Sequence, residues 1–226
     1  LQTPVLVVSD VDMGMNDWVC DKFEWSDSFS YNRGKVLGFE ELEKLDSYGR
    51  YLDSDNDGIC YRTYPGTHPE KGAYFTRGTS HDEYARYTED GNINAETLMR
   101  LMRKFRTASE LVPPPIIEIN GEDSCGIIYY GSSKPAVLEA KDILKTKDIN
   151  VDLMQIRSFP FNLDVWEFIA SHDRIYVVEQ NRDSQMRTLI MAEGGISAEI
   201  LRPLVHFTGD PIEASYIVNK ISEREV

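Results

Sequence analysis

The chain has 226 residues, of which 41% are hydrophobic, so it can bury one large domain or two small ones and is not expected to be disordered throughout. Its net charge of −14 would repel phosphate backbones and anionic lipids, which argues against nucleic acid and membranes as partners. No apolar run approaches the roughly 20 residues that a membrane-spanning helix needs.

The cysteines indicate the cellular compartment of the protein, and the first residues indicate whether the chain is part of a longer protein. Three widely separated cysteines form no Cys-x-x-Cys pair, so this chain is not expected to hold an iron–sulfur cluster or a zinc ribbon. Their odd, sparse number suits a reducing cytoplasm. The segment from Leu1 to Val8 lacks an initiator methionine and a basic region, and it suggests a strand already under way. We therefore expect a chain cut from a longer protein.

The first half of the chain shows little regular patterning. We expect a strand at 5–8 and helices at 40–47 and 95–105, separated by long stretches rich in Asp, Gly, Tyr and Arg. Loops of this length are usually functional or need a partner surface. Three consecutive prolines at 113–115 cannot lie inside a helix or a central strand. We therefore predict a first region at 1–112, a Pro-rich linker at 113–121 and a second domain at 122–226.

The second half alternates between strand and helix patterns. Strands are expected at 125–130, 151–156, 174–179 and 201–207, and helices at 135–147, 163–170, 184–192 and 212–221. This alternation predicts a doubly wound, mostly parallel sheet covered on both faces. The loops at 131–133, 157–160 and 179–182 should meet at the carboxyl edge of that sheet, where they would bind a ligand or serve as subunit contacts or loop caps.

Two polar loops of the first region are candidate sites. Asp53, Asp55 and Asp57, followed by Gly58, match the start of a calcium loop, but Tyr64 stands where the twelfth-position Glu should be. An Asx-rich turn is therefore favoured, and the three aspartates remain weak metal candidates. The run from Arg77 to Glu83 combines a cation, hydroxyls, an imidazole and carboxylates. It would bind a carboxylated substrate through Arg77, or it is a solvated, hydrogen-bonded loop.

Several motifs, in their order along the chain, resemble one family. They are Ser9-Asp10-x-Asp12-x-Gly14-Met15-Asn16-Asp17-Trp18, Asp53-x-Asp55-x-Asp57-Gly58-Ile59-x-Tyr61-Arg62-Thr63-x-Pro65-Gly66-Thr67, Gly72-Ala73-Tyr74-Phe75-Thr76-Arg77-Gly78-Thr79-x-His81-Asp82, Pro160-Phe161 and Val177-Val178-Glu179-Gln180-Asn181-Arg182-Asp183. Over nearly the whole chain they are similar to alpha subunits of 2-oxoglutarate, or more broadly 2-oxoacid:ferredoxin oxidoreductases. The resemblance implies the end of a thiamine-diphosphate-binding, pyrimidine-type domain followed by a transketolase C-terminal-like domain.

The resemblance also implies an activity and a set of partners. The enzyme would convert a 2-oxoacid, with 2-oxoglutarate favoured, and coenzyme A to acyl-CoA and carbon dioxide, and it would reduce ferredoxin. Thiamine diphosphate with Mg²⁺ and an iron–sulfur cluster would be held mostly by the beta subunit of an oligomer. No cofactor is therefore expected on this chain alone, and the isolated chain is expected to be inactive.

The family's site residues carry over only in part. The upstream glutamate that activates the aminopyrimidine and the Tyr-Pro-x-x-Pro run are not found in this sequence. The resemblance implies catalytic roles for Asp82 and His81 and substrate-binding roles for Arg77 and Thr79. It leaves the cofactor-binding residues open. The alternative is a non-enzymatic cation-binding or assembly module with an α/β domain, which calcium binding would reveal.

Overall fold

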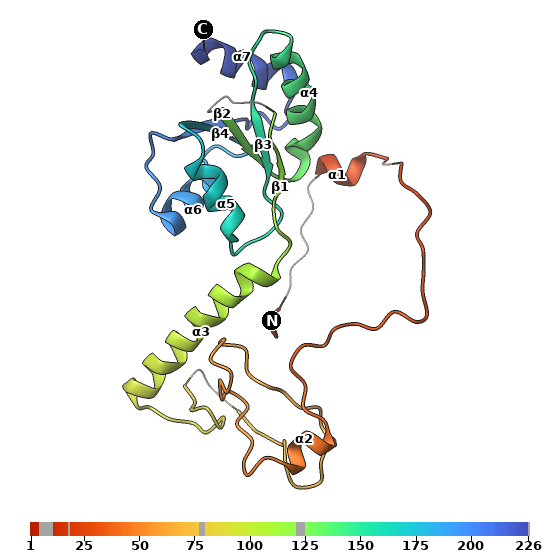
Figure 1. The fold of residues 1–226 in the computed structure, drawn as a ribbon, viewed down its shortest axis with the longest axis vertical. Helices are drawn as coiled ribbons and strands as arrows, with labels where there is room; N and C mark the ends of the chain where they lie inside the picture. Colours follow the sequence, from red (N-terminus) through yellow and green to blue (C-terminus); the bar gives the residue numbers. More distant parts are fainter. Residues whose placement is uncertain (5–10, 18, 77–79, 121–124, 226) are drawn as a thin grey trace. The chain divides into compact units, whose positions relative to one another are not determined.

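The computed structural model describes residues 1–4, 11–17, 19–76, 80–120 and 125–225, shown in Figure 1. The chain forms two compact units. Unit 1 comprises Leu1–Leu6 and Val19–Leu111, and unit 2 comprises Val7–Trp18 and Val112–Val226. The strand predicted at 5–8 lies outside the described residues. We describe each unit by itself.

Unit 2 is built on a five-stranded sheet with the order β1-β3-β2-β4-β5. The strands are β1 (Ile116–Glu118), β2 (Cys125–Tyr129), β3 (Asp152–Gln155), β4 (Arg174–Glu179) and β5 (Leu201–Val205). Strands β2 to β5 pair in parallel, and β1 pairs antiparallel with β3 at one edge. The predicted α/β class with a mostly parallel sheet is therefore confirmed.

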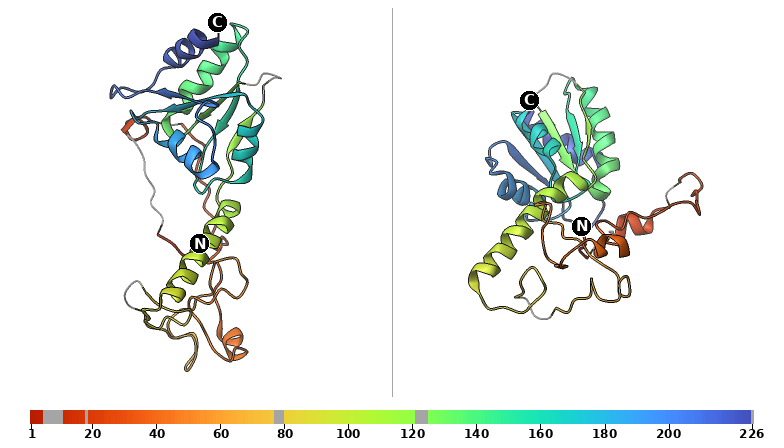
Figure 2. Two further views of the ribbon diagram at one scale, coloured as in Figure 1. Left: turned by 90° about the vertical axis from the view of Figure 1, so that its left-hand side faces the viewer. Right: turned by 60° about the horizontal axis from the view of Figure 1, so that its bottom comes forward.

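Helices cover both faces of this sheet, as Figure 1 and Figure 2 show. Helices α4 (Lys134–Lys145) and α7 (Ala214–Glu225) lie on one face, and α5 (Leu163–Ala170) and α6 (Gln185–Gly194) lie on the other. A short 3₁₀ turn, Gly131–Ser133, leads into α4, and the short helix α1 (Val11–Met15) also belongs to this unit.

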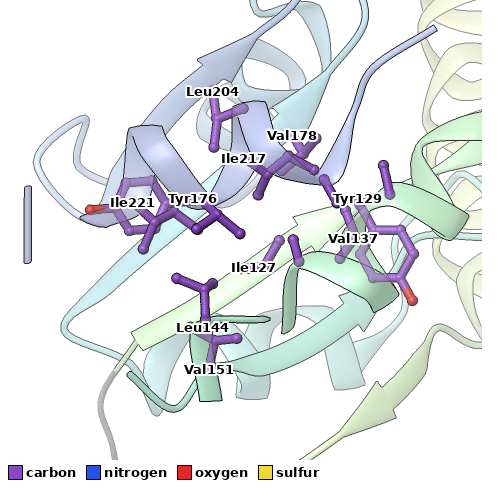
Figure 3. Close-up of a cluster of buried hydrophobic side chains, with 14 of the residues drawn as sticks. Ile127, Tyr129, Val137, Leu144, Val151, Tyr176, Val178, Leu204, Ile217 and Ile221 are labelled. Atoms are coloured by element: carbon purple, nitrogen blue, oxygen red, sulfur yellow. The ribbon is translucent and has the colours of Figure 1, made fainter. Parts of the chain in front are cut away.

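The two faces follow from the alternation of side chains along each strand. In β2, Ile127 packs toward α4 and α7 while Ile128 packs toward α5 and α6, and both are fully buried. In β4, Tyr176 and Val177 divide in the same way. Figure 3 shows the first of these two clusters, which joins the sheet to α4 and α7. Burial on both faces explains why the central strands β2 and β4 have mainly apolar sequences.

One expectation for this half of the chain needs correction. The segment 113–121 was expected to be only a linker, but β1 lies within it and forms the antiparallel edge of the sheet. The prolines at 113–115 precede this strand, so they do not interrupt its hydrogen bonds. The other differences are small: β5 ends at Val205, two residues before its predicted end, and α7 (Ala214–Glu225) begins two and ends four residues after its predicted bounds.

Unit 1 has far less regular structure. Its helices are α2 (Phe39–Glu43), shorter than predicted, and α3 (Gly91–Leu111), longer than predicted. Isolated bridges join Val36 to Arg62 and His81 to Tyr87. Its buried apolar side chains are few, namely Leu42, Ile59, Cys60, Ala85 and Ala108. No helix among the described residues has the length and apolar character needed to cross a membrane.

Candidate active site

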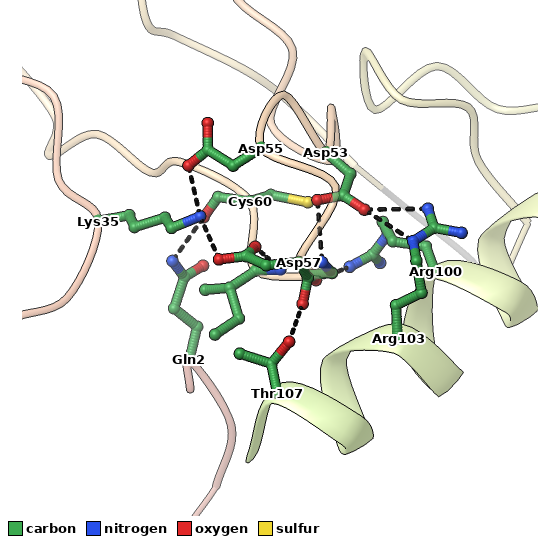
Figure 4. A network of polar contacts seen from close by, with 11 residues as sticks. Gln2, Lys35, Asp53, Asp55, Asp57, Cys60, Arg100, Arg103 and Thr107 are labelled. Carbon is green, nitrogen blue, oxygen red and sulfur yellow. Dashed lines mark hydrogen bonds and ion pairs between the residues drawn. The ribbon is translucent and has the colours of Figure 1, made fainter. Parts of the chain in front are cut away.

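The Asp-rich loop of unit 1 is folded around cations and backbone amides of the protein itself (Figure 4). The carboxylate of Asp53 accepts hydrogen bonds from Gly58 N (2.9 Å) and from Nε and Nη2 of Arg103 on α3 (3.1 and 2.9 Å). Lys35 Nζ lies 2.6 Å from a carboxylate oxygen of both Asp55 and Asp57. Each aspartate therefore already has a protein partner, as expected of an Asx-rich structural turn.

The surroundings of Gly58 explain why a glycine ends this Asp-rich run. Its φ is +80°, and a Cβ added there would lie 2.6 Å from Lys104 Cα and 2.7 Å from the Arg100 carbonyl oxygen. Arg100 Nη1 and Thr107 Oγ1 donate to the carbonyl oxygens of Gly58 and Asp57. The loop is therefore pressed onto the backbone of α3, and only glycine fits at the point of contact.

The loop that carries His81 and Asp82 is a tight turn held by one carboxylate oxygen. Oδ1 of Asp82 accepts hydrogen bonds from the backbone N–H groups of Tyr84 and Arg86, both at 2.9 Å. Between them, Ala85 is 4% exposed and has a φ of +68°, which is strained for a residue with a Cβ. Tyr51 N donates to Glu83 O (2.9 Å) and ties the turn to the neighbouring segment. Asp82 is thus held in one orientation.

His81 and Asp82 face different hollows of unit 1. Asp82 lines a cleft of about 710 Å³ together with three arginines, Arg86, Arg100 and Arg103, and three further carboxylates, Asp53, Glu83 and Glu96. His81 lines a second, smaller cavity; its ring stacks on Tyr51 at 3.8 Å between centroids, and its Nδ1 donates to Asp82 O. Arg77 and Thr79, the predicted substrate-binding residues, lie outside the described residues.

The three arginines of the cleft beside Asp82 are its groups that could bind a carboxylated ligand, although four carboxylates line the same cleft. Guanidinium groups bind carboxylates through paired, charge-assisted hydrogen bonds, and a fixed carboxylate can accept a proton or orient a water molecule. Arg86, Arg100 and Arg103 were not predicted to face this loop. The two residues on α3 are three positions apart and lie on one side of the helix, a spacing that a helical projection of the basic stretch would have revealed.

The loops at the carboxyl edge of the sheet in unit 2 cap one another. Glu179 at the end of β4 is fully buried and accepts hydrogen bonds from Met186 N (2.7 Å) and Arg187 N (3.0 Å) in the first turn of α6. Gln180 Nε2 donates to Ser132 Oγ (2.9 Å), so the loops after β2 and β4 meet as predicted. Burial and the nearby Glu179 raise the pKa of Tyr130, which donates to that carboxylate. These contacts match loop capping, one of the alternatives to ligand binding that the sequence predicts for these loops.

We tested whether the described residues fit the metals that the family resemblance implies. No group of three or more His, Cys, Asp or Glu side chains in the described part of the chain could hold a metal ion. Cys20 is exposed, whereas Cys60 and Cys125 are buried and belong to different units. These residues do not fit an iron–sulfur cluster, and they offer no set of three protein ligands for Mg²⁺.

Comparison with known proteins identifies the class to which the relatives belong. No protein-family model matches the chain. It is 28% identical over 200 residues to the alpha subunit of 2-oxoacid:ferredoxin oxidoreductase 2 of Aeropyrum pernix, which covers 84% of this chain and 29% of that protein. It is 25% identical over 201 residues to the 2-oxoacid:ferredoxin oxidoreductase alpha subunit of Saccharolobus solfataricus, with 86% and 30% covered. The chain thus spans about three tenths of the length of these curated relatives.

A solved structure shares the fold. The 2-oxoglutarate:ferredoxin oxidoreductase of Magnetococcus marinus, with 2-oxoglutarate, coenzyme A and succinyl-CoA bound, superposes with a TM-score of 0.70 and 23% identity over 80% of this chain and 31% of that one. The resemblance read from the motifs is confirmed: the curated relatives are 2-oxoacid:ferredoxin oxidoreductase alpha subunits, and they match most of the 226 residues.

Proposed function

We propose that the chain works as part of the alpha subunit of a 2-oxoacid:ferredoxin oxidoreductase. The complete enzyme would convert a 2-oxoacid, with 2-oxoglutarate as the favoured substrate, and coenzyme A to acyl-CoA and carbon dioxide while reducing ferredoxin. The observation that carries this proposal is the similarity to curated alpha subunits over 84% of the chain. The similar fold of the 2-oxoglutarate enzyme supports it.

The chain would contribute to a shared reactive centre in an oligomer with the beta subunit. Thiamine diphosphate, when bound in the complete enzyme, would supply the carbanion chemistry. We assign that cofactor, its Mg²⁺ and the iron–sulfur cluster mostly to the beta subunit, as the resemblance to the family implies. The isolated chain is therefore expected to be inactive, and unaided decarboxylation of a 2-oxoacid by the purified chain would contradict this assignment.

Within this centre we assign Asp82 the role of a catalytic contact and His81 a supporting one. The turn fixes Asp82 through Oδ1, and Asp82 lines a cleft with three arginines. The arginines would attract the carboxylate of the substrate, and Asp82 would accept a hydrogen bond or a proton from a water molecule or another donor group at the reactive centre. Arg77 and Thr79 complete the proposed substrate-binding loop.

The turn makes it possible to separate the charge of Asp82 from its structural role. Asp82→Asn keeps an Oδ1 that can accept from Tyr84 N and Arg86 N but removes the negative charge. In the complete enzyme, assayed with 2-oxoglutarate, coenzyme A and ferredoxin, we expect turnover to fall about 100-fold, as for loss of a general acid or base. The melting temperature should hardly change, whereas Asp82→Ala should lower both.

The matched control is Asp90→Asn. Asp90 is an exposed carboxylate that likewise accepts a backbone N–H, from Asn92, through its Oδ1 (2.8 Å). This isosteric change should leave turnover unchanged. If Asp82→Asn also keeps full activity, Asp82 only holds the turn and must be removed from the site.

The alternative function is a non-enzymatic cation-binding or assembly module. It depended on free carboxylates at 53–57, and the structure engages these with Lys35 and Arg103. Thermal melts with and without millimolar calcium decide between the two functions. We expect no shift in the melting temperature, since binding to the folded state alone would raise it.

A further inference from the structure

The smaller cavity of unit 1 has a one-sided electrostatic lining. It measures about 320 Å³, and Arg50, Arg100, Lys104 and His81 line it. No Asp or Glu is among its lining residues in the described part of the chain, although the sequence has 38 acidic residues and 24 Lys and Arg. A group of cations without a neighbouring carboxylate, in so acidic a chain, suggests that an anionic ligand supplies the negative charge.

The hydrogen bonds within the cavity do not supply that charge. Arg50 Nη2 donates to the side-chain amide oxygen of Gln2 (2.9 Å), and Arg100 Nη1 donates to the carbonyl oxygen of Gly58 (3.0 Å). Lys104 Nζ reaches the carbonyl oxygen of Gln2 only at 3.5 Å. In the described part of the chain, the recorded hydrogen-bond acceptors of these three cations are thus neutral oxygens.

The neighbouring groups leave the positive charge uncompensated. Burial lowers the pKa of Lys104, and the nearby Arg100 and Arg50 act in the same direction. Burial raises the pKa of the Cys60 thiol, which keeps it neutral despite the cations. Asp53 is already paired with Arg103, whose Nε and Nη2 both donate to its Oδ2. The cations are held together by the fold although they repel one another.

Tyr51 gives the cavity an aromatic wall. The guanidinium carbons of Arg50 and Arg100 lie 5.2 and 5.9 Å from the centroid of its ring, and His81 stacks on the same ring. Cation–π contacts orient a guanidinium group without neutralising it. The donors are thereby held in place around the cavity before any ligand arrives.

We propose that this cavity binds the phosphate group of a small molecule, either a phosphate monoester or inorganic phosphate. Two guanidinium groups and an ammonium group match a dianion with several acceptor oxygens better than they match a monocarboxylate. The volume is at the lower end of the range for small-molecule sites. This cavity shares Arg100 with the cleft beside Asp82 and His81 with the proposed reactive centre, but phosphate binding is not part of the proposed reaction and is tested without any activity assay.

Isothermal titration calorimetry of the protein at constant ionic strength tests the site with three probes: inorganic phosphate, glycerol 3-phosphate and acetate. We expect saturable binding of the phosphates and much weaker binding of acetate. Tighter binding of glycerol 3-phosphate than of inorganic phosphate would identify a monoester as the ligand, and the reverse would identify free phosphate. No saturable binding of either phosphate would overturn the proposal.

Lys104→Met is the decisive variant. Loss of one charge-assisted hydrogen bond should weaken phosphate binding about tenfold. In phosphate-free buffer this variant should melt at the same temperature as the parent protein or higher, because the change removes a half-buried charge that is repelled by its neighbours. A lysine with a purely structural role would lower the melting temperature. Lys22→Met, at an exposed lysine of the same unit, is the control and should change neither quantity.

Arg50→Gln provides a second, independent variant if Lys104→Met fails to fold. It removes another cation from the lining, and phosphate affinity should again fall about tenfold. If both variants bind phosphate as the parent protein does, the anion binds elsewhere and the assignment of this cavity is wrong.

Discussion

The two units of this chain are stabilised in opposite ways. Unit 2 buries apolar side chains on both faces of its sheet, with Ile127 and Ile128 fully enclosed on either side of one strand. Unit 1 has a small apolar core and joins its long loops to α3 through Asp53, Gly58 and Arg103. Apolar burial tolerates many sequences of similar volume, whereas a polar and steric junction depends on individual residues.

Helix α3 shows this contrast within a single element. Arg100, Arg103 and Thr107 bond to the Asp-rich loop, while Leu98 and Phe105 are 55% and 53% exposed. The helix therefore presents its polar side chains to its own unit. In unit 2 the apolar sides of the helices pack against the sheet, as the usual amphipathic arrangement requires.

The largest effect should come from Gly58→Ala, which disrupts the contact between the Asp-rich loop and α3 in unit 1. The new Cβ would meet the backbone of α3, which cannot move aside as a flexible side chain does, and φ at +80° adds strain. We expect a loss of about 4 kcal/mol or more in the free energy of unfolding. Hydrogen exchange followed peptide by peptide should show lost protection at 35–111 and retained protection at 125–223.

Gly66→Ala is a control that separates backbone strain at positive φ from the steric clash of a new Cβ with α3. Gly66 has the same φ of +80°, but nothing lies within 4 Å of an added Cβ. This control should cost only about 1 kcal/mol. Equal costs for the two substitutions would mean that the close approach of Gly58 to α3 does not stabilise unit 1.

The complementary experiment, Ile127→Ala, removes a buried side chain from the apolar core of unit 2 instead of changing unit 1. Ile127 is fully buried, and removing its side-chain carbons should cost about 3 kcal/mol through lost burial and the cavity left behind. Hydrogen exchange should now lose protection in unit 2 first. Leu163→Ala, at a position 66% exposed, should change the free energy of unfolding by less than about 0.5 kcal/mol. Loss of protection confined to unit 1 would contradict the comparison.

A smaller effect is expected from Asp53→Ala. The Asp53 side chain is 7% exposed, and its loss leaves Gly58 N and the Arg103 guanidinium group without their acceptor. The cost should be about 2 kcal/mol. Asp55→Ala removes a carboxylate that is 43% exposed and pairs with Lys35, and it should cost clearly less than Asp53→Ala because solvent screens an exposed ion pair. Similar values from chemical denaturation would show that burial of the ion pair is unimportant.

The sequence predicted unit 2 well because its signal is periodic. Strand β4 and helix α5 were predicted with their observed bounds, since apolar runs and helical spacing report burial directly. Strand β1 was missed because it is three residues long, exposed at all three positions and next to prolines, so nothing in its pattern marks an edge strand.

The candidate site was predicted less completely because its chemistry depends on contacts between distant segments. The sequence drew attention to His81 and Asp82, but not to the way the Asp82 turn places them in different hollows. Arg50, Arg100 and Lys104 lie up to 54 positions apart and meet only in the folded unit. Charge counted along the chain indicates an acidic protein, and only the fold reveals a local cationic cavity.

The smallest effect, and the finest test of the polar junction, is its response to acid. The hydrogen bond from Lys35 lowers the pKa of Asp55, and the hydrogen bond from His68 lowers the pKa of Glu43. A carboxyl whose pKa is lower in the folded state stabilises that state above its unfolded pKa of about 4, and this contribution is lost as the pH falls through the folded value. In thermal melts recorded from pH 7 to pH 3, the melting temperature of unit 1 should therefore fall below about pH 4. The double variant Asp55→Asn, Glu43→Gln should flatten this acid limb, whereas Asp46→Asn, at an exposed carboxylate of the same unit, should not. An unchanged acid limb in the double variant would show that these two pairs do not contribute to the stability of unit 1.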